Sequence, residues 1–126
     1  MSRLILILAT VFITAGAAVQ AHHSFAAEFD INLPVNIRGT VTKLDWMNPH
    51  SWIYLDVKTP DGTVEQWEVE TAAPTQLMRR GMRRTDFPIG IEVQITGFRA
   101  RHKTHVAAAR SVKKADGTEY FLSSEQ

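Results

Sequence analysis

The stretch that most constrains the fold is residues 35–57, VNIRGTVTKLDWMNPHSWIYLDV, which reads as two strands joined by a polar corner. Apolar residues alternate from Val35 to Val41, but the alternation then changes phase, so Leu44 and Trp46 point to the other face. A phase change close to Gly39 is typical of a bulge or a sharp bend. The first strand is therefore expected to bend and to serve two sides of a small barrel.

The second strand, after the corner at residues 48–50, has two distinct faces. Side chains of a strand point alternately to opposite sides. One face carries Ile53, Leu55 and Val57 and is expected to join the core. The other carries Trp52 and Tyr54 and is expected to be a partly exposed aromatic surface.

The rest of the chain alternates strand patterns with turn signals, and one segment has a helical pattern instead. Pro and Gly mark the boundaries of these segments. The expected elements are a strand at 64–71 after a turn at 59–62, a helix at 72–80 with an apolar edge at Leu77 and Met78, strands at 91–97 and 106–112, and a short strand at 119–122.

This order resembles that of the OB-fold, a five-stranded, partly open Greek-key barrel. The sequence predicts a mainly β protein, a small OB-like barrel of five to six strands over residues 35–122, with one short helix between strands 3 and 4. Residues 22–34 are expected to form an N-terminal arm. The alternative, a β-sandwich, has about seven strands, more than the sequence shows.

Residues 1–21 have the pattern of a secretory signal peptide. Arg3 precedes the apolar run 4–13, and residues 19–21, Val-Gln-Ala, fit a cleavage site after Ala21. A retained membrane anchor is the alternative, but a span needs about 20 apolar residues and this run is shorter. Cleavage predicts a periplasmic or secreted protein with no transmembrane segment.

Removing 21 of the 126 residues leaves 105, enough for one modest core. The chain has no cysteine, which excludes disulfides and thiolate ligands. Basic residues are concentrated after position 70 and acidic residues before it. The two halves either present opposite charges at the surface or neutralise each other across the fold.

Three short motifs resemble those of a family of small exported bacterial proteins known only as a domain of unknown function. They are HHSF at residues 22–25, NPH at 48–50 followed by Trp52, and RRG at 79–81. The resemblance implies export and a single compact domain. It implies no established activity.

His22, His23 and His50 are the candidate metal ligands. After cleavage at Ala21, the α-amine and imidazole of His22 can chelate one metal ion, with His23 or His50 as a further ligand. Neutral nitrogen donors suit copper, nickel or zinc, and copper is the candidate cofactor. The alternatives are that the histidine pair is only a soluble chain start, and that the His50 ring hydrogen-bonds the turn backbone.

His102 and His105 lie in a basic turn, where they are expected to be solvated. They could share a metal only if the turn brought them together.

A second candidate surface combines aromatic and basic residues. Trp46, Trp52, Tyr54 and Trp67 could form a platform of the kind OB-folds use for stacking, although a domain this small is expected to need at least two of them in its core. Arg79, Arg80, Arg83 and Arg84 form the densest positive cluster. Because export makes nucleic acid a less available partner, an envelope protein or ligand is the candidate partner, with a merely solvated helix end as the alternative.

Enzyme signatures are lacking in the sequence. It has no cysteine nucleophile, glycine-framed serine, phosphate loop or His-Glu helix motif. Glu68 and Glu70 have strand spacing on a face expected to be solvated. The sequence therefore predicts a binding module and not an enzyme.

Overall fold

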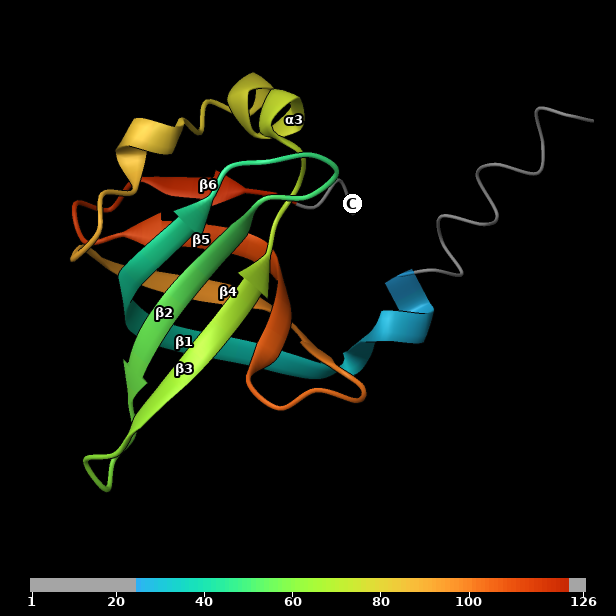
Figure 1. Ribbon diagram of the computed structural model, residues 1–126, viewed down its shortest axis with the longest axis vertical. Coiled ribbons are helices and arrows are strands. Elements are labelled where there is room, and N and C mark those ends of the chain that lie inside the picture. The colour runs from blue at the N-terminus through green and yellow to red at the C-terminus, as the bar shows by residue number, and fades with distance from the viewer. Residues whose placement is uncertain (1–24, 123–126) are drawn as a thin grey trace, which may run out of the picture.

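The computed structural model of the protein describes residues 25–122 (Figure 1). The expected signal peptide, His22 and His23 lie outside these residues. The described chain forms one six-stranded sheet with the strand order β3-β2-β1-β4-β5-β6. Its elements are β1 (Phe29–Asp45), β2 (Trp52–Lys58), β3 (Val64–Glu70), α3 (Pro74–Arg79), the 3-10 helix η1 (Arg84–Asp86), β4 (Glu92–Ala100), β5 (Val106–Lys114) and β6 (Glu119–Phe121).

Five of the strands form a near-closed ring. Neighbours in the sheet order pair antiparallel, and a short parallel contact between β3 and β5 joins the two sides of the ring. The strand β6 lies outside the ring and pairs with β5. The prediction of a mainly β protein with a short helix between β3 and β4 is confirmed.

The long strand β1 is shared between two partners. It pairs with β4 as far as Thr40 and with β2 from Thr40 onward, with a register shift between Val41 and Lys43. This irregularity lies where the sequence pattern changes phase. A side chain at Gly39 would lie 2.8 Å from the carbonyl oxygen of Asp56, so the glycine lets β2 approach β1 closely. The strand begins at Phe29, earlier than the expected start at Val35.

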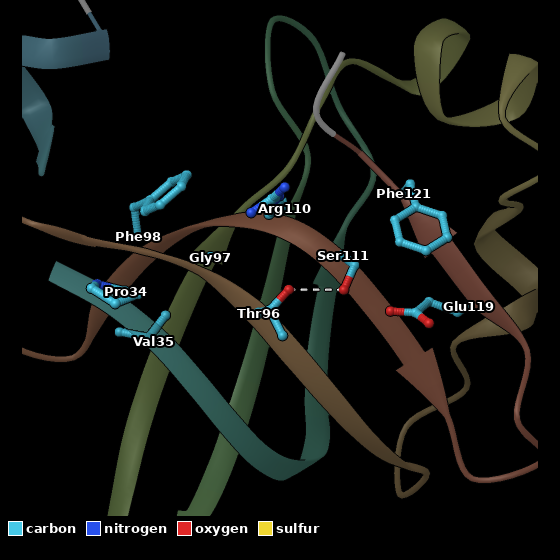
Figure 2. Close-up of a pocket in the computed structure, with 9 residues that line it drawn as sticks. All are labelled: Pro34, Val35, Thr96, Gly97, Phe98, Arg110, Ser111, Glu119 and Phe121. Carbon is cyan, nitrogen blue, oxygen red and sulfur yellow. Dashed lines mark hydrogen bonds between the residues drawn. The ribbon is translucent and has the colours of Figure 1, made fainter. Parts of the chain in front are cut away.

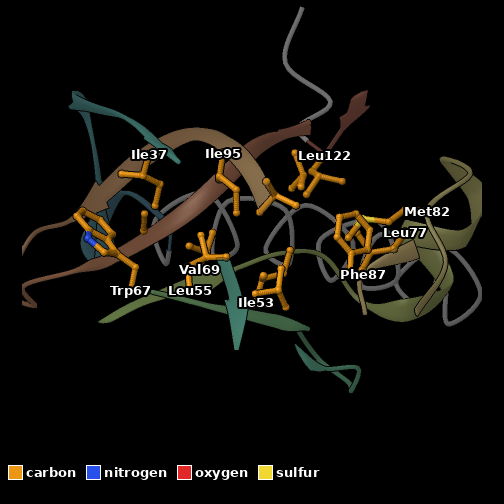
Figure 3. Close-up of a cluster of buried hydrophobic side chains, with 14 residues drawn as sticks. Ile37, Ile53, Leu55, Trp67, Val69, Leu77, Met82, Phe87, Ile95 and Leu122 are labelled. Atoms are coloured by element: carbon orange, nitrogen blue, oxygen red, sulfur yellow. The ribbon is translucent and has the colours of Figure 1, made fainter. Parts of the chain in front are cut away.

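The main core fills the ring and includes the predicted strand residues Ile53 and Leu55, whereas Val57 lies only at its edge. Figure 3 shows that Trp67 lies near one end of this cluster and that Leu77, Met82 and Phe87 gather at the other. These three residues come from α3 and the segment that follows it, which therefore cover that end of the ring. Met78 was expected at the apolar edge of the helix, but it is 52% exposed, and Met82 is buried in its place.

A second, smaller apolar cluster surrounds the first residue of β1. Phe29 is buried against Ala100, Val106 and Ala108, with Trp52 and Phe98 packed at the edge.

Within residues 25–122, no helix has the length and apolar character needed to cross a membrane.

Gly97 allows β4 and β5 to approach each other next to a register shift. A Cβ atom at this position would overlap the carbonyl oxygen of Ala108, which is backbone and cannot rotate away. Gly97→Ala is therefore expected to lower the free energy of unfolding by about 3 kcal/mol. Urea denaturation measures this change.

Gly62→Ala is the matched control. Gly62 has a positive φ of 89° in the β2–β3 turn, but no atom lies within 4 Å of the added Cβ. Its cost is the backbone strain alone, about 1 kcal/mol. Equal losses at the two glycines would contradict the close approach at Gly97.

Candidate functional site

The corner between β1 and β2 is held by Ser51, which is fully buried. Its hydroxyl accepts a hydrogen bond from the Met47 backbone N–H at 3.3 Å and lies 3.4 Å from the Met47 carbonyl oxygen. Its own carbonyl oxygen accepts hydrogen bonds from the backbone N–H and the hydroxyl of Thr71. These hydrogen bonds join the two sides of the corner to each other and to the end of β3. They fix the position of His50, which directly precedes Ser51.

His50 faces Glu70 across this junction. Its Nδ1 lies 2.5 Å from Oε1 of Glu70, a direct contact between the imidazole and the carboxyl group. The His50 side chain is 53% exposed, whereas the Glu70 side chain is only 12% exposed. The partner of one ring nitrogen determines which nitrogen is free, so Nε2 of His50 is left available to a ligand.

Two expectations about this corner are corrected. Bonding of the His50 ring to the turn backbone was the alternative to metal ligation, but within residues 25–122 the partner of the ring is the Glu70 carboxylate. Glu70 was expected to be solvated, but it pairs with Trp52 on one side and with Ala108 on the other, so both flanks are covered. Glu68, two residues earlier, is exposed as expected.

The carboxyl of Glu70 has a pKa above its usual value. Burial is the main cause, and the negative charge of Glu28 acts in the same direction. Electrostatic interactions with His50 and Lys103 oppose this rise. Glu28 and Lys103 are therefore near enough to Glu70 to act on it, and the site lies where the arm, the corner and the β4–β5 loop meet.

Arg101 holds the end of the arm against the β4–β5 loop. Its guanidinium donates to the carbonyl oxygen of Ala26 at 2.7 Å and to the carboxylate of Asp30 at 2.9 Å. Its backbone N–H donates to the carbonyl oxygen of Glu28. The sequence pattern placed Arg101 only in a basic turn. Acidic residues in the arm, such as Asp30, were the sequence signal that Arg101 could have an ion-pair partner.

The two histidines of the basic turn have separate surroundings. His105 lies 3.4 Å from a carboxylate oxygen of Glu65 and packs against the Trp67 ring, whereas His102 is exposed. Across residues 25–122, no three His, Asp or Glu side chains are grouped so that they could hold a metal ion. His22 and His23 are not among those residues, so the proposed ligand set is left as a prediction.

Trp46, Trp52 and Tyr54 do not form one open platform. Trp46 packs at the edge of the main core and Trp52 at the edge of the second cluster. The Tyr54 hydroxyl donates to Asp45 at 3.1 Å, and the Lys43 ammonium lies 4.7 Å from the centre of its ring. Each side chain is half-buried and has its own packing partners.

The four arginines of the positive cluster are all exposed. Arg79 is the last residue of α3, Arg80 follows it, and Arg83 and Arg84 flank the start of η1. None of the ion pairs within the described chain includes any of them. They belong to α3, η1 and the turn between them, which lie at one end of the ring (Figure 1).

Comparison with known proteins identifies the family of the chain. The profile of a family of unknown function, DUF6152, matches residues 10–108. The chain belongs to this family. The match includes the corner, Glu70 and the Arg101 contacts, and it ends within β5. No curated protein matches the chain.

The raised pKa of Glu70 predicts how stability depends on pH in a His50→Asn background, which removes the imidazole that contacts the carboxyl. The contribution of the protonated Glu70 carboxyl is complete below the usual glutamate pKa and is lost as the pH rises through the raised value. The free energy of unfolding, relative to the additional Glu70→Gln variant, is therefore expected to fall as the pH rises above about 4. Urea denaturation across this range tests it.

Glu68→Gln in the same background is the control, since Glu68 is exposed on the same strand. It is expected to produce a smaller change with pH. A relative stability that is constant or rises with pH at Glu70 would contradict the burial of its carboxyl.

Proposed function

We propose that this member of the DUF6152 family is an exported OB-like binding module that holds a late transition metal ion, copper, through His22, His23 and His50. The observation that carries the proposal is the contact between His50 Nδ1 and the buried carboxylate of Glu70. Histidines that bind metals usually donate their other ring N–H to a carboxylate, which orients the ring and raises its basicity. The contact of His50 Nδ1 with Glu70 fits this arrangement and leaves Nε2 for the metal.

The order of the elements supports the OB-like assignment. Five strands form a near-closed ring, the first is long and bent, and the helix α3 lies between β3 and β4. An OB-fold has these features. The apolar run at residues 4–13 and the cleavage pattern at residues 19–21 support export.

The placement of the arm supports His22 and His23 as partners of His50. Arg101 fixes the chain from Ala26 to Asp30, and the charge of Glu28 acts on Glu70 at the corner. Residues 25–28 are helical, so the reach of the histidines beyond Phe25 is that of the three residues 22–24, about 10 Å. The helix that precedes β1 thus connects the corner to the segment that carries the two histidines.

The chemistry of the ligand set favours copper. Cleavage after Ala21 would give His22 a free α-amine, so that one residue supplies two nitrogen donors and His50 a third. Imidazole and amine nitrogens suit Cu(II), which has the highest affinity among the divalent ions of the first transition row. The ligand nitrogens must be deprotonated, so binding is expected to weaken on acidification.

Calorimetric titration with Cu(II) of the protein that starts at His22 tests this function. One ion is expected to bind, and His50→Asn is expected to remove the corner ligand. Glu70→Gln leaves every ligand in place but removes the carboxylate that orients the His50 ring, so it is expected to weaken binding about 10- to 100-fold.

His102→Asn is the control, because His102 is exposed and is not among the proposed ligands. A protein that retains Ala21 is expected to show a different affinity and a different Cu(II) electron paramagnetic resonance spectrum. Absent binding, or binding unchanged by both the added residue and His50→Asn, would exclude the site.

A second candidate function is interaction with the cell envelope without a metal, and it is favoured by the four exposed arginines near α3. Trp46, Trp52 and Tyr54, which are half-buried, would add only limited contact area. An arginine near an anionic lipid surface contributes about 1 kcal/mol. Four of them would suffice for measurable binding to a phosphatidylglycerol vesicle.

Replacing Arg79, Arg80, Arg83 and Arg84 by Ser is expected to abolish sedimentation with phosphatidylglycerol vesicles while leaving the thermal unfolding midpoint nearly unchanged. The control replaces four other exposed basic residues, Arg38, Lys58, Lys103 and Lys113, by Ser. This control variant is expected to bind nearly as well as the parent. Equal loss in both variants would indicate a non-specific charge effect and would contradict an arginine surface.

A further inference from the structure

A hollow of about 560 Å³ lies on the outer side of the sheet where β1, β4, β5 and β6 run side by side (Figure 2). Its shape follows from the sizes of the side chains. Small residues, Thr96, Gly97 and Ser111, form the floor, whereas Phe98 and Phe121 stand at the sides. None of these residues belongs to the corner around His50. The volume is within the range typical of small-molecule sites.

The floor carries an unused hydrogen-bond donor. The hydroxyl oxygens of Thr96 and Ser111 lie 2.8 Å apart and share one hydrogen bond. Two hydroxyls have two hydrogens, and this contact uses only one of them. Since the pair forms no other side-chain hydrogen bond within residues 25–122, the second hydrogen is free for a ligand. Ser111 is 4% exposed, which fixes its position on the floor.

The sides of the hollow are apolar and aromatic. Phe121 is 65% exposed although it lies in a strand, and Phe98 is half-buried at the edge of the second apolar cluster. The two rings stand on either side of the hydroxyl pair in Figure 2, with Pro34 below Phe98. A flat or branched apolar group placed against the exposed Phe121 ring would cover aromatic surface that water now contacts.

The two charges at the hollow differ in sign and position. Arg110 lies between the two phenylalanine rings in Figure 2, whereas the carboxylate of Glu119 lies beside Ser111. No ion pair or side-chain hydrogen bond within the described chain involves Arg110. Its guanidinium is therefore free to bind a carboxylate through two parallel N–H donors. Glu119 would repel a second anionic group.

We propose that this hollow binds a small organic monoanion that has one carboxylate and one apolar ring. The carboxylate pairs with Arg110, the ring lies against Phe121, and the free hydroxyl hydrogen of the Thr96–Ser111 pair donates to the ligand. This site is separate from the proposed metal site. Arg110, Glu119 and Phe121 also lie beyond the region that the DUF6152 profile matches.

Phenylacetate and phenylacetamide are matched probes, since they share a ring and differ in charge. Titration of the ¹⁵N-labelled protein is expected to shift the backbone amide signals of Gly97, Ser111 and Phe121 with phenylacetate. A ligand of this size is expected to have a dissociation constant of roughly several millimolar. Phenylacetamide is expected to bind about tenfold more weakly, because a charged partner strengthens the hydrogen bonds of the guanidinium.

Arg110→Gln is expected to remove the preference for phenylacetate over phenylacetamide, and Phe121→Ser to weaken both probes. Lys113→Gln, which removes the same charge from the same strand outside the hollow, is the control and is expected to retain the parent affinity. The absence of shifts, shifts confined to other residues, or equal affinity for both probes would overturn the proposal. Shifts of these signals with protein concentration alone would also overturn it, because a second copy of the chain would then be the occupant.

Discussion

The structure depends on the short parallel contact between β3 and β5. It joins Glu68, Val69 and Glu70 to Val106, Ala107 and Ala108, and it connects the edge strand β3 to β5, so that five strands form a near-closed ring. Small alanine side chains on β5 let the strands approach closely. Val69 and Ala107 have no exposed surface as a result. The same contact covers one flank of Glu70, so the closure of the ring and the burial of that carboxylate have one cause.

The bent strand β1 makes this closure geometrically possible, and its main features could be predicted from the sequence. The phase change after Val41 and the small residue at Gly39 are local signals, and a local signal is visible without knowledge of the fold. The alternation in β2 likewise gave the correct core face, with Ile53 and Leu55 buried. The succession of strands along the chain and the position of the short helix were indicated by turn residues, which are also local signals.

The features that could not be predicted arise from contacts between distant parts of the chain. The pattern of β3 placed Glu70 on the outer face, where it was expected to be solvated. In the structure β5 pairs with β3 at Ala108 and covers one flank of Glu70. This pairing joins residues far apart in the sequence, and the alternation within β3 does not indicate it. Arg101 was ambiguous for the same reason, because its partners belong to the arm 71 residues or more away. Met78 in α3 and Met82 in the segment after it are equally apolar, and only the direction of the chain after Gly81 decides which of them reaches the core.

The two proposed sites differ in how they depend on the fold. His50 is oriented by a carboxylate whose burial costs free energy, and this cost is offset by the packing that closes the ring, so the corner exists only in the closed structure. The hollow depends instead on β6, which lies outside the ring, and on Arg110 and Phe121, which are exposed and contribute little to core packing. Substitutions that abolish the hollow should therefore leave the ring intact. Substitutions that open the ring should disrupt the corner first, because Glu70 is part of the closing contact.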